Sequence, residues 1–410
     1  MKQPAAEAAP PDQWTLIRGA RQLLTLRGAS GPRRGSAMAD LAVIPDGAIL
    51  IRNGIIEKIG SSRQVENSSG ARVAREIDAA GGIVMPAFVD PDIALATPVS
   101  GPVPDRRAAV HFDEPDIRRM SRRRLEEGAT TISAELVRYG ILSIGSHTLF
   151  ANDLRSTVKA LRLHKSMQNR PIRIRSLFSP PWLADDAAGN HFNRVSDAWM
   201  PIILQKQLSA VLEVPVAAQW VDESHALAAA GAACGFNLRM RVSGVQTESV
   251  MRLACAAGSI AILGVLPESS AAARALADMG CVQVALAANI LAGKSTSARG
   301  AVDDGMPLAL ASGYRHDAAA SYNPQFLLHL ACQNLCLRPE EAIVAATYNA
   351  ACSLRLSHVT GSLELGKQGD ICVMDVDDYR ELVRRAGHHD VKLVLRSGKI
   401  VYRRAGLVAE

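Results

Sequence analysis

The three successive runs VLEVPVAAQW (211–220), SHALAAAGAACG (224–235) and NLRMRV (237–242) decide the fold. The first and third are short and apolar, as strands are, whereas the middle run is rich in alanine and closes with glycine, a common helix end. A strand, a helix and a further strand in direct succession are typical of parallel βαβ construction.

Six further apolar runs alternate with helical segments in the same way: GIVMPAFV (82–89), TTISAELV (130–137), IRIRSLF (172–178), SIAILGVL (259–266), VQVALAA (282–288) and PLALAS (307–312). Together they make eight βα units in about 230 residues, the size of a (β/α)8 TIM barrel. Alternation alone also fits an open doubly wound sheet, so both architectures stay open at this point.

The two ends of the chain have a different pattern, with short strand-like stretches between turns. Asp46-Gly47 and Asn53-Gly54 are dipeptides typical of hairpins, and 361–403 is strand-like again. Hairpins need a second sheet to cover their apolar face. We therefore expect a flexible arm at 1–13, a composite β-sandwich domain from 14–82 and 359–410, and a barrel domain at 83–358.

Composition excludes several classes of protein. The net charge of +6 arises from 46 basic and 40 acidic residues, and the densest basic run, RRMSRRRLEE (118–127), carries its own carboxylates. Aromatic residues make up only 4%, which argues against nucleic-acid binding. The seven cysteines are dispersed, and no run of about 18 apolar residues occurs. We expect a cytoplasmic protein that binds neither nucleic acid nor membrane.

Several motifs resemble the amidohydrolase superfamily, most closely its imidazolonepropionase branch: RQLLTLRG (21–28), DGAILIRNGIIEKIG (46–60), GIVMPAFVD (82–90), LRPEEAIVAATYNAA (337–351), GSLELGKQGDICVMDVDDYRELV (361–383) and VLRSGKIVY (394–402). The resemblance runs from about Trp14 to Tyr402. It implies a distorted (β/α)8 barrel beside a composite sandwich, and a hydrolase acting on non-peptide C–N bonds of cyclic amides. It also implies Zn or Fe at the barrel mouth, where the metal activates a water molecule.

The positions that match the family's metal ligands do not carry ligands here. They read Asp92, Ala94, Arg241 and Gly313, and the strand at 259–266 is wholly apolar. A guanidinium stays protonated and repels a cation, so Arg241 opposes metal binding. Pro180-Pro181 replaces a further histidine, and Glu213, beside the expected position of the acidic base, should point away. We expect no metal cofactor and a loss of the family's reaction.

The residues around that mouth suggest two uses. An anionic small molecule could bind Arg241 together with further candidate residues, namely Asp92, Glu135, Arg138, Tyr139, Lys294, Arg315 and His316. Alternatively, Arg241 pairs with Asp92 or Glu135 in a structural salt bridge that fills the former metal position.

Three functional hypotheses follow. The first is a catalytically inactive scaffold, a pseudoenzyme that assembles as a homodimer or with a partner protein. The second is a binding protein for a small anionic metabolite, and the third is a metal-independent hydrolase that uses Asp92, Glu135 or His316.

Overall fold

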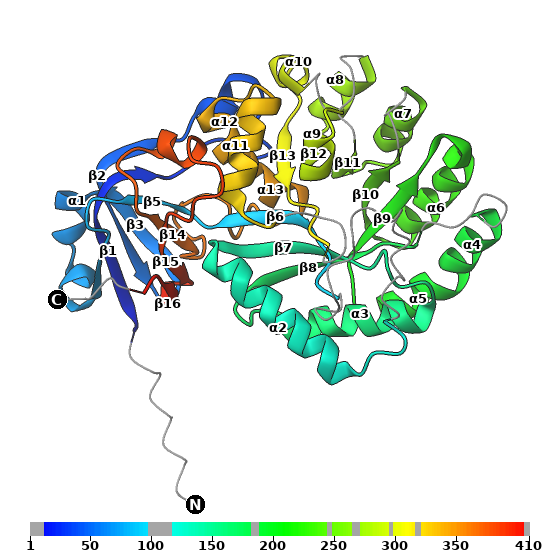
Figure 1. The fold of residues 1–410 in the computed structure, drawn as a ribbon, viewed down its shortest axis with the longest axis horizontal. Coiled ribbons are helices and arrows are strands. Elements are labelled where there is room, and N and C mark those ends of the chain that lie inside the picture. The colour runs from blue at the N-terminus through cyan, green and yellow to red at the C-terminus, as the bar shows by residue number, and fades with distance from the viewer. Residues whose placement is uncertain are drawn as a thin grey trace, which may run out of the picture.

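A computed structural model describes residues 12–96, 117–181, 188–243, 248–264, 271–294, 298–315 and 321–405. Within these residues the strands form two eight-stranded sheets. One is parallel and curls into a barrel surrounded by helices, and the other combines both ends of the chain (Figure 1). The expectation of a (β/α)8 barrel with an additional sheet domain is confirmed.

The barrel strands pair in chain order: β6 (Phe88–Ile93), β7 (Ile141–His147), β8 (Arg173–Phe178), β9 (Val211–Val216), β10 (Asn237–Val242), β11 (Ala261–Leu263), β12 (Val282–Leu286) and β13 (Leu308–Ala311). The first and last strands approach each other just beyond their ends. There the Ala94 N–H donates to the Tyr314 carbonyl at 2.9 Å, and Ile93 and Tyr314 form a parallel bridge. The sheet is therefore nearly closed, which rules out the open doubly wound alternative.

Helices cover the outside of the barrel (Figure 1). They are α2 (Arg122–Arg138), α3 (Leu154–Met167), α4 (Ala188–Arg194), α5 (Met200–Gln205), α6 (Val221–Ala233), α7 (Glu248–Ala256), α8 (Ala271–Asp278), α9 (Ala287–Leu291), α10 (Ala298–Asp303), α11 (Pro324–Asn334), α12 (Pro339–Ala345) and α13 (Tyr348–Ser353).

Helix α13 closes the end of the barrel where its strands begin. The Asn349 side chain donates to the carbonyl of Leu308, the first residue of β13, and the Val89 N–H near the start of β6 donates to Ala346. Ala350, Ala351 and Leu354 share one apolar core with inward residues of the strands. The other end of the barrel, where parallel strands finish, is therefore where polar side chains gather.

The terminal sheet has the order β16-β15-β14-β5-β1-β2-β3, with β4 beside β1. Its members are β1 (Trp14–Leu24), β2 (Val43–Arg52), β3 (Ile55–Ser61), β4 (Arg75–Asp78), β5 (Ile83–Pro86), β14 (Ile371–Met374), β15 (Val391–Arg396) and β16 (Lys399–Arg403), with α1 (Ser62–Glu66) after β3. Antiparallel pairing of β5 with β14 joins the two ends of the chain. Ile17, Ile49, Val373 and Leu395 belong to one core, so strands from both ends enclose common apolar side chains.

Two expected strands differ from the structure. TTISAELV (130–137) lies in α2, because its apolar residues continue the helical spacing of Leu125, Ala129, Ile132 and Leu136, all buried. The barrel strand is the next apolar run, Ile141–His147. GIVMPAFV (82–89) is divided, since Ile83–Pro86 pairs with β1 and β14 in the terminal sheet and the barrel begins only with β6.

One of the two expected hairpins is wrong as well. Asn53-Gly54 does connect β2 to β3, but Asp46-Gly47 lies inside β2. Asp46 has a left-handed backbone with φ of 46°, and the pairing of β1 with β2 is irregular between Ile17 and Ala20. The dipeptide therefore belongs to a strand with a local irregularity and not to a chain reversal.

Candidate functional site

Four charged side chains lie inside the barrel, on β6, β9 and β10. In β9, Leu212, Val214 and Val216 pack outward against the helices, so Glu213 points inward. The same alternation in β10 turns Leu238, Met240 and Val242 outward and both arginines, Arg239 and Arg241, inward. Asp92 reaches the same space from β6.

The four side chains form one network of ion pairs, which we call the mouth network: Asp92, Glu213, Arg239 and Arg241. Arg241 donates from Nε to Glu213 Oε1 at 2.6 Å and from Nη1 to Asp92 Oδ2 at 3.3 Å. It also donates from Nη2 to Asp92 Oδ1. The carboxylate of Asp92 is thus held by two nitrogens of one guanidinium, the geometry that gives arginine pairs their strength.

Arg239, two residues before Arg241 on β10, completes the mouth network. Its Nη2 donates to Asp92 Oδ1 at 3.3 Å, and its Nη1 donates to the Pro91 carbonyl at 2.8 Å. Its Nε lies 2.8 Å from Glu213 Oε2, a contact of opposite charges whose angle is not that of a hydrogen bond. Two cations and two anions therefore balance.

The mouth network is almost entirely removed from water, which makes its charge balance important. The exposed fraction of the side chain is 0% for Arg239, 1% for Glu213, 2% for Asp92 and 12% for Arg241. Burial alone would raise the pKa of both carboxyls, but the guanidiniums of Arg241 and Arg239 outweigh it and hold the pKa of Asp92 and Glu213 below their ordinary values. Both carboxylates are therefore ionised at neutral pH.

Polar groups from β7 and the segment after β8 surround the mouth network. Ser179 Oγ donates to Glu213 Oε1 at 2.9 Å, and Thr148 exchanges two 3.0 Å hydrogen bonds with the backbone of Ser179. His147, the last residue of β7, is buried, and burial lowers the pKa of its imidazole to about 4. The neighbouring charges of Asp92, Arg241, Glu213 and Arg315 act on this ring, so it lies beside the mouth network.

A further buried carboxyl, that of Asp90, lies two residues before Asp92 on β6. Its oxygens accept hydrogen bonds from the backbone N–H groups of Ser312, at 3.2 and 3.3 Å, and of Asp92, at 3.1 Å. No cation pairs with it among the described residues, and burial raises its pKa to about 7. Asp90 therefore joins the first and last strands of the barrel through hydrogen bonds, and its raised pKa leaves it partly protonated at neutral pH.

The structure brings together only some of the candidate residues. Asp92 and Arg241 are in direct contact, as the salt-bridge alternative predicts. Arg315 stacks its guanidinium 4.4 Å from the ring centroid of Phe150, whose ring is 5.7 Å from that of His147. Lys294 is exposed after α9. His316 lies outside the described residues.

The other three candidates form a different group. Glu135 and Arg138 pair with each other at 3.5 Å in the last turn of α2. Tyr139 packs edge-on against Tyr322 and against His389, at 5.7 and 4.9 Å between ring centroids. These contacts are with the segment before α11 and with the terminal sheet domain, so this group does not contribute to the mouth network.

Three members of the site were missed or misjudged from the sequence. Glu213 was expected to point away, but it shares the inward parity of Val211 and Pro215. Arg239 stands two residues before Arg241, so alternation along NLRMRV indicates that both face the same way. His147 ends the apolar, strand-like run 141–147, and its place at the end of that run could have identified it from the sequence.

The residues at the mouth do not fit a divalent metal ion. In the described parts of the chain, no group of three or more His, Cys, Asp or Glu side chains is arranged to hold one. Neither Ala94 nor Gly313 has a side-chain atom that could bind a metal. Both carboxylates already neutralise guanidiniums in the space that a cation would need.

Comparison with known proteins places these observations in a family context. A family model described as the Amidohydrolase family matches residues 208–401. The imidazolonepropionase of Geobacillus kaustophilus is 26% identical over 413 residues, covering 94% of this chain and 97% of the relative. That of Solibacter usitatus is 29% identical over 415 residues, covering 94% and 98%.

Solved structures agree on the fold. A triazine hydrolase variant superposes with a TM-score of 0.74 at 16% identity, covering 97% of this chain and 96% of the other. The guanine deaminase of E. coli gives a TM-score of 0.67 at 14% identity, covering 96% and 100%. Among the described residues, no helix is long and apolar enough to cross a membrane.

Proposed function

This chain belongs to the amidohydrolase superfamily, in its imidazolonepropionase-like branch, and we propose that it does not carry out the family's metal-dependent hydrolysis of C–N bonds. In this proposal it is a pseudoenzyme that acts by binding and not by turnover. The observation that carries the proposal is the mouth network, in which two arginines and two carboxylates fill the space at the ends of β6, β9 and β10.

The arginines oppose a metal in two ways. A guanidinium cannot lose its proton in a protein, so Arg239 and Arg241 repel a divalent cation at any physiological pH. They also neutralise Asp92 and Glu213, the acidic side chains that could otherwise attract one. Binding a metal there would require breaking buried ion pairs. Breaking them would leave charged side chains buried without a partner, which is energetically costly.

The charge state of the site also argues against hydrolysis without a metal. An efficient general base has a pKa near the working pH. Burial raises the pKa of Asp92 and Glu213, but the neighbouring arginines outweigh it and leave both pKa values lowered, so both carboxylates are weak bases. Glu135, the other described acid in that hypothesis, pairs with Arg138 on α2 instead.

Metal analysis combined with an activity assay tests this proposal. The protein is purified from cells grown with Zn and Fe, and the metal bound per chain is measured beside turnover of imidazolone propionate, with the Geobacillus kaustophilus imidazolonepropionase as the positive control. We expect far less than one metal ion per chain and no turnover. About one bound Zn or Fe per chain, or turnover that Asp92→Ala abolishes, would overturn the proposal.

A second function, binding of a small anion at the mouth, is favoured by one observation. Arg241 is the member of the mouth network that keeps 12% of its side chain exposed, and Arg315 lies nearby against Phe150. A dicarboxylate or phosphate ester could pair with both guanidiniums. A thermal-shift screen tests this idea, because a ligand at 100 times its Kd stabilises by about 2.7 kcal/mol. Retention of the shift in Arg315→Gln would contradict it.

A further inference from the structure

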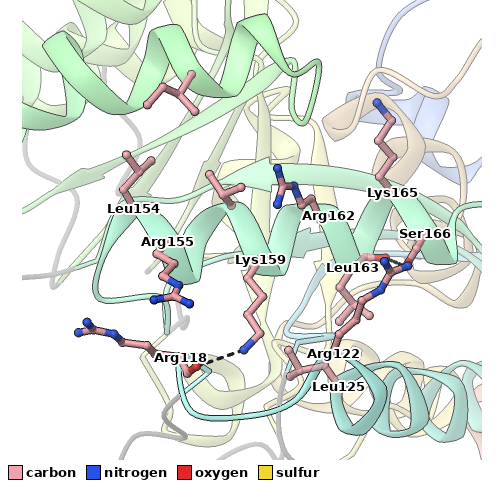
Figure 2. Close-up of a pocket in the computed structure, with 12 residues that line it drawn as sticks. Arg118, Arg122, Leu125, Leu154, Arg155, Lys159, Arg162, Leu163, Lys165 and Ser166 are labelled. Atoms are coloured by element: carbon pink, nitrogen blue, oxygen red, sulfur yellow. Dashed lines mark hydrogen bonds between the residues drawn. The ribbon is translucent and has the colours of Figure 1, made fainter.

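A large groove among the described residues lies outside the barrel, away from the mouth network. It follows α3, with α2 and the loop before it on one side and Ile202 of α5 on the other, and it has a volume of about 860 Å³. Figure 2 shows the cationic side chains of α3 spreading to both sides of that helix. We call it the α3 groove.

The α3 groove has a basic rim. Six of its lining side chains are cationic, and no acidic side chain is among the described residues that line it: Arg118, Arg122, Arg155, Lys159, Arg162 and Lys165. Arg122 pairs with Glu126 at 2.8 Å, and Arg118 lies 3.7 Å from Asp153. No ion pair with another described residue involves Arg155, Arg162 or Lys165, so the groove keeps an excess of positive charge.

The floor of the α3 groove is apolar. Leu125 and Leu163 are buried, and Leu154, Val158 and Ile202 are half-buried between the helices. Lys159 fixes one wall, because its Nζ donates to the carbonyls of Ile117, at 2.8 Å, and Arg118, at 3.2 Å (Figure 2). Lys159 therefore links α3 to the loop before α2 along this wall.

We propose that the α3 groove is a docking surface for an acidic amphipathic helix of a partner protein. An amphipathic helix places apolar residues on one face, which suits the floor, and acidic residues along its flanks, which suit the rim. Arg155 and Lys165 lie ten residues apart on α3, about 15 Å at the rise of an α-helix, so about three turns of a partner helix match the basic rim.

Two other kinds of partner fit less well. No described residue lining the α3 groove is aromatic, so single-stranded nucleic acid would have no side chain on which to stack a base. A lipid bilayer needs protruding apolar side chains, whereas those of Leu154, Val158 and Ile202 are half-buried below long cationic ones. An inserted helix reaches the floor, and a flat membrane does not.

Charge reversal tests the basic rim. The probe is a fluorescein-labelled 18-residue peptide with leucine at helical spacing and glutamate on the flanks, and binding is followed by fluorescence anisotropy. The triple variant Arg155→Glu, Arg162→Glu, Lys165→Glu should weaken binding by about tenfold or more, because three attractive contacts become repulsive. The control triple, Arg72→Glu, Arg274→Glu, Lys399→Glu, makes the same change in net charge at exposed sites outside the groove and should change binding less than about twofold.

A floor variant separates an amphipathic partner from simple charge attraction. Val158→Lys with Ile202→Lys adds positive charge and removes apolar surface, so it should lose the peptide but still bind poly-glutamate. Circular dichroism and thermal unfolding confirm that each variant is folded. Equal peptide binding by the wild type and the rim triple, or no binding by the wild type, would overturn the proposal. Groove-dependent binding of phosphatidylserine vesicles or of an oligonucleotide, with no peptide binding, would do so as well.

This surface is independent of the pseudoenzyme proposal. None of the substituted residues lies in the mouth network, so metal content and turnover report on one proposal and peptide binding on the other.

Discussion

At the scale of single residues, the two arginines inside the barrel need opposite charges as partners. Each guanidinium taken out of water carries a desolvation cost of several kcal/mol, which only well-placed opposite charges offset. Asp92 and Glu213 supply those charges, and the Pro91 carbonyl and Ser179 hydroxyl satisfy further hydrogen bonds. The mouth network is therefore sensitive to loss of any one member and less sensitive to balanced changes.

Removal of one member should be strongly destabilising. Arg239→Met leaves the two buried carboxylates with only one arginine to neutralise them, so the free energy of unfolding should fall by about 3–5 kcal/mol. In Arg239→Met with Glu213→Leu one charge of each sign is gone, and the loss should be smaller than the sum of the two single losses. Urea unfolding measures both. The control Arg123→Met removes an exposed pair with Glu127 and should leave stability unchanged within error; equal losses in Arg239→Met and Arg123→Met would contradict the account.

Two buried histidines should make the protein sensitive to acid. Burial lowers the pKa of His147 to about 4 and that of His164 to about 3. Both are neutral in the folded state, while the unfolded chain takes up protons below about pH 6.5. The free energy of unfolding should therefore fall as the pH drops from about 6.5 towards 4, by about 1.4 kcal/mol per pH unit for each histidine. His164→Gln should remove one of the two histidine contributions and so about half of the slope that the two histidines cause. An unchanged slope would show that His164 is not a buried neutral imidazole.

Asp90 should have the opposite effect. Its raised pKa of about 7 means that the folded protein keeps a proton that the unfolded chain loses above about pH 4. Stability from this group is present at low pH and is lost as the pH rises to 7, by about 2–3 kcal/mol between pH 5 and 8. Asp90→Asn cannot ionise, so the variant should gain about this amount relative to the wild type over that interval. Parallel pH profiles from denaturant titrations would show that Asp90 does not titrate there.

At the scale of elements, the turn from α2 to β7 fixes how the barrel meets the terminal sheet. Ser121 caps α2 by accepting the Arg124 N–H, and the helix ends at Arg138, followed by Tyr139 and by Gly140 in the left-handed region at φ of 82°. A Cβ on Gly140 would lie 2.4 Å from the Sγ of Cys372 on β14, and the Cys372 thiol lies 3.4 Å from the Gly140 carbonyl. Glycine is needed for both its backbone conformation and its small size.

A pair of alanine substitutions separates those two reasons. Gly235 has nearly the same φ, 83°, but no atom within 4 Å of a built Cβ. Gly235→Ala should cost only the conformational penalty, about 1–2 kcal/mol. Gly140→Ala should cost about 1–3 kcal/mol more, because the packed sulfur cannot move freely. Thermal unfolding of both variants measures the difference, and equal losses would mean that the contact with Cys372 relaxes without cost.

At the scale of the whole molecule, a buried aspartate holds the two sheets together. Asp370, before β14, accepts from Arg173 of β8 at 3.0 Å and from Arg396 of β15 at 2.8 Å. Apolar residues of the terminal sheet, including Met85 and Met374, share one core with the barrel helices and strands. We therefore expect the two parts to unfold together.

Replacement of Asp370 should weaken the contact between the barrel and the terminal sheet. Asp370→Ala leaves Arg173 and Arg396 facing each other in a buried site, so the loss should be about 3–5 kcal/mol. Asp375→Ala removes a half-exposed pair with Arg404 on the same sheet and should cost less than about 1 kcal/mol. Scanning calorimetry should show the larger fall in Tm for Asp370→Ala, with a second transition if the parts separate. Similar Tm values for the two variants would contradict this role.

Much of the fold could be predicted from the sequence, with specific failures. The runs at 172–178, 211–220, 237–242, 259–266, 282–288 and 307–312 each contain a barrel strand. TTISAELV failed because β-branched composition was weighed above helical spacing, and Glu213 failed because the inward parity of β9 was assigned to the wrong residues. Of the candidate site, the contact between Asp92 and Arg241 was predicted, whereas Glu135, Arg138 and Tyr139 lie in a separate group of contacts.

The sequence by itself determined the alternation of strands and helices, the strand-like ends of the chain and the residue type at each position, because hydrophobic periodicity and residue identity are local properties of the chain. Only the tertiary structure decided which charges meet. Asp92, Glu213 and Arg239 are separated by up to 147 residues and come into contact through strand register and barrel closure. The strength of their pairing depends on burial, which no short stretch of sequence specifies.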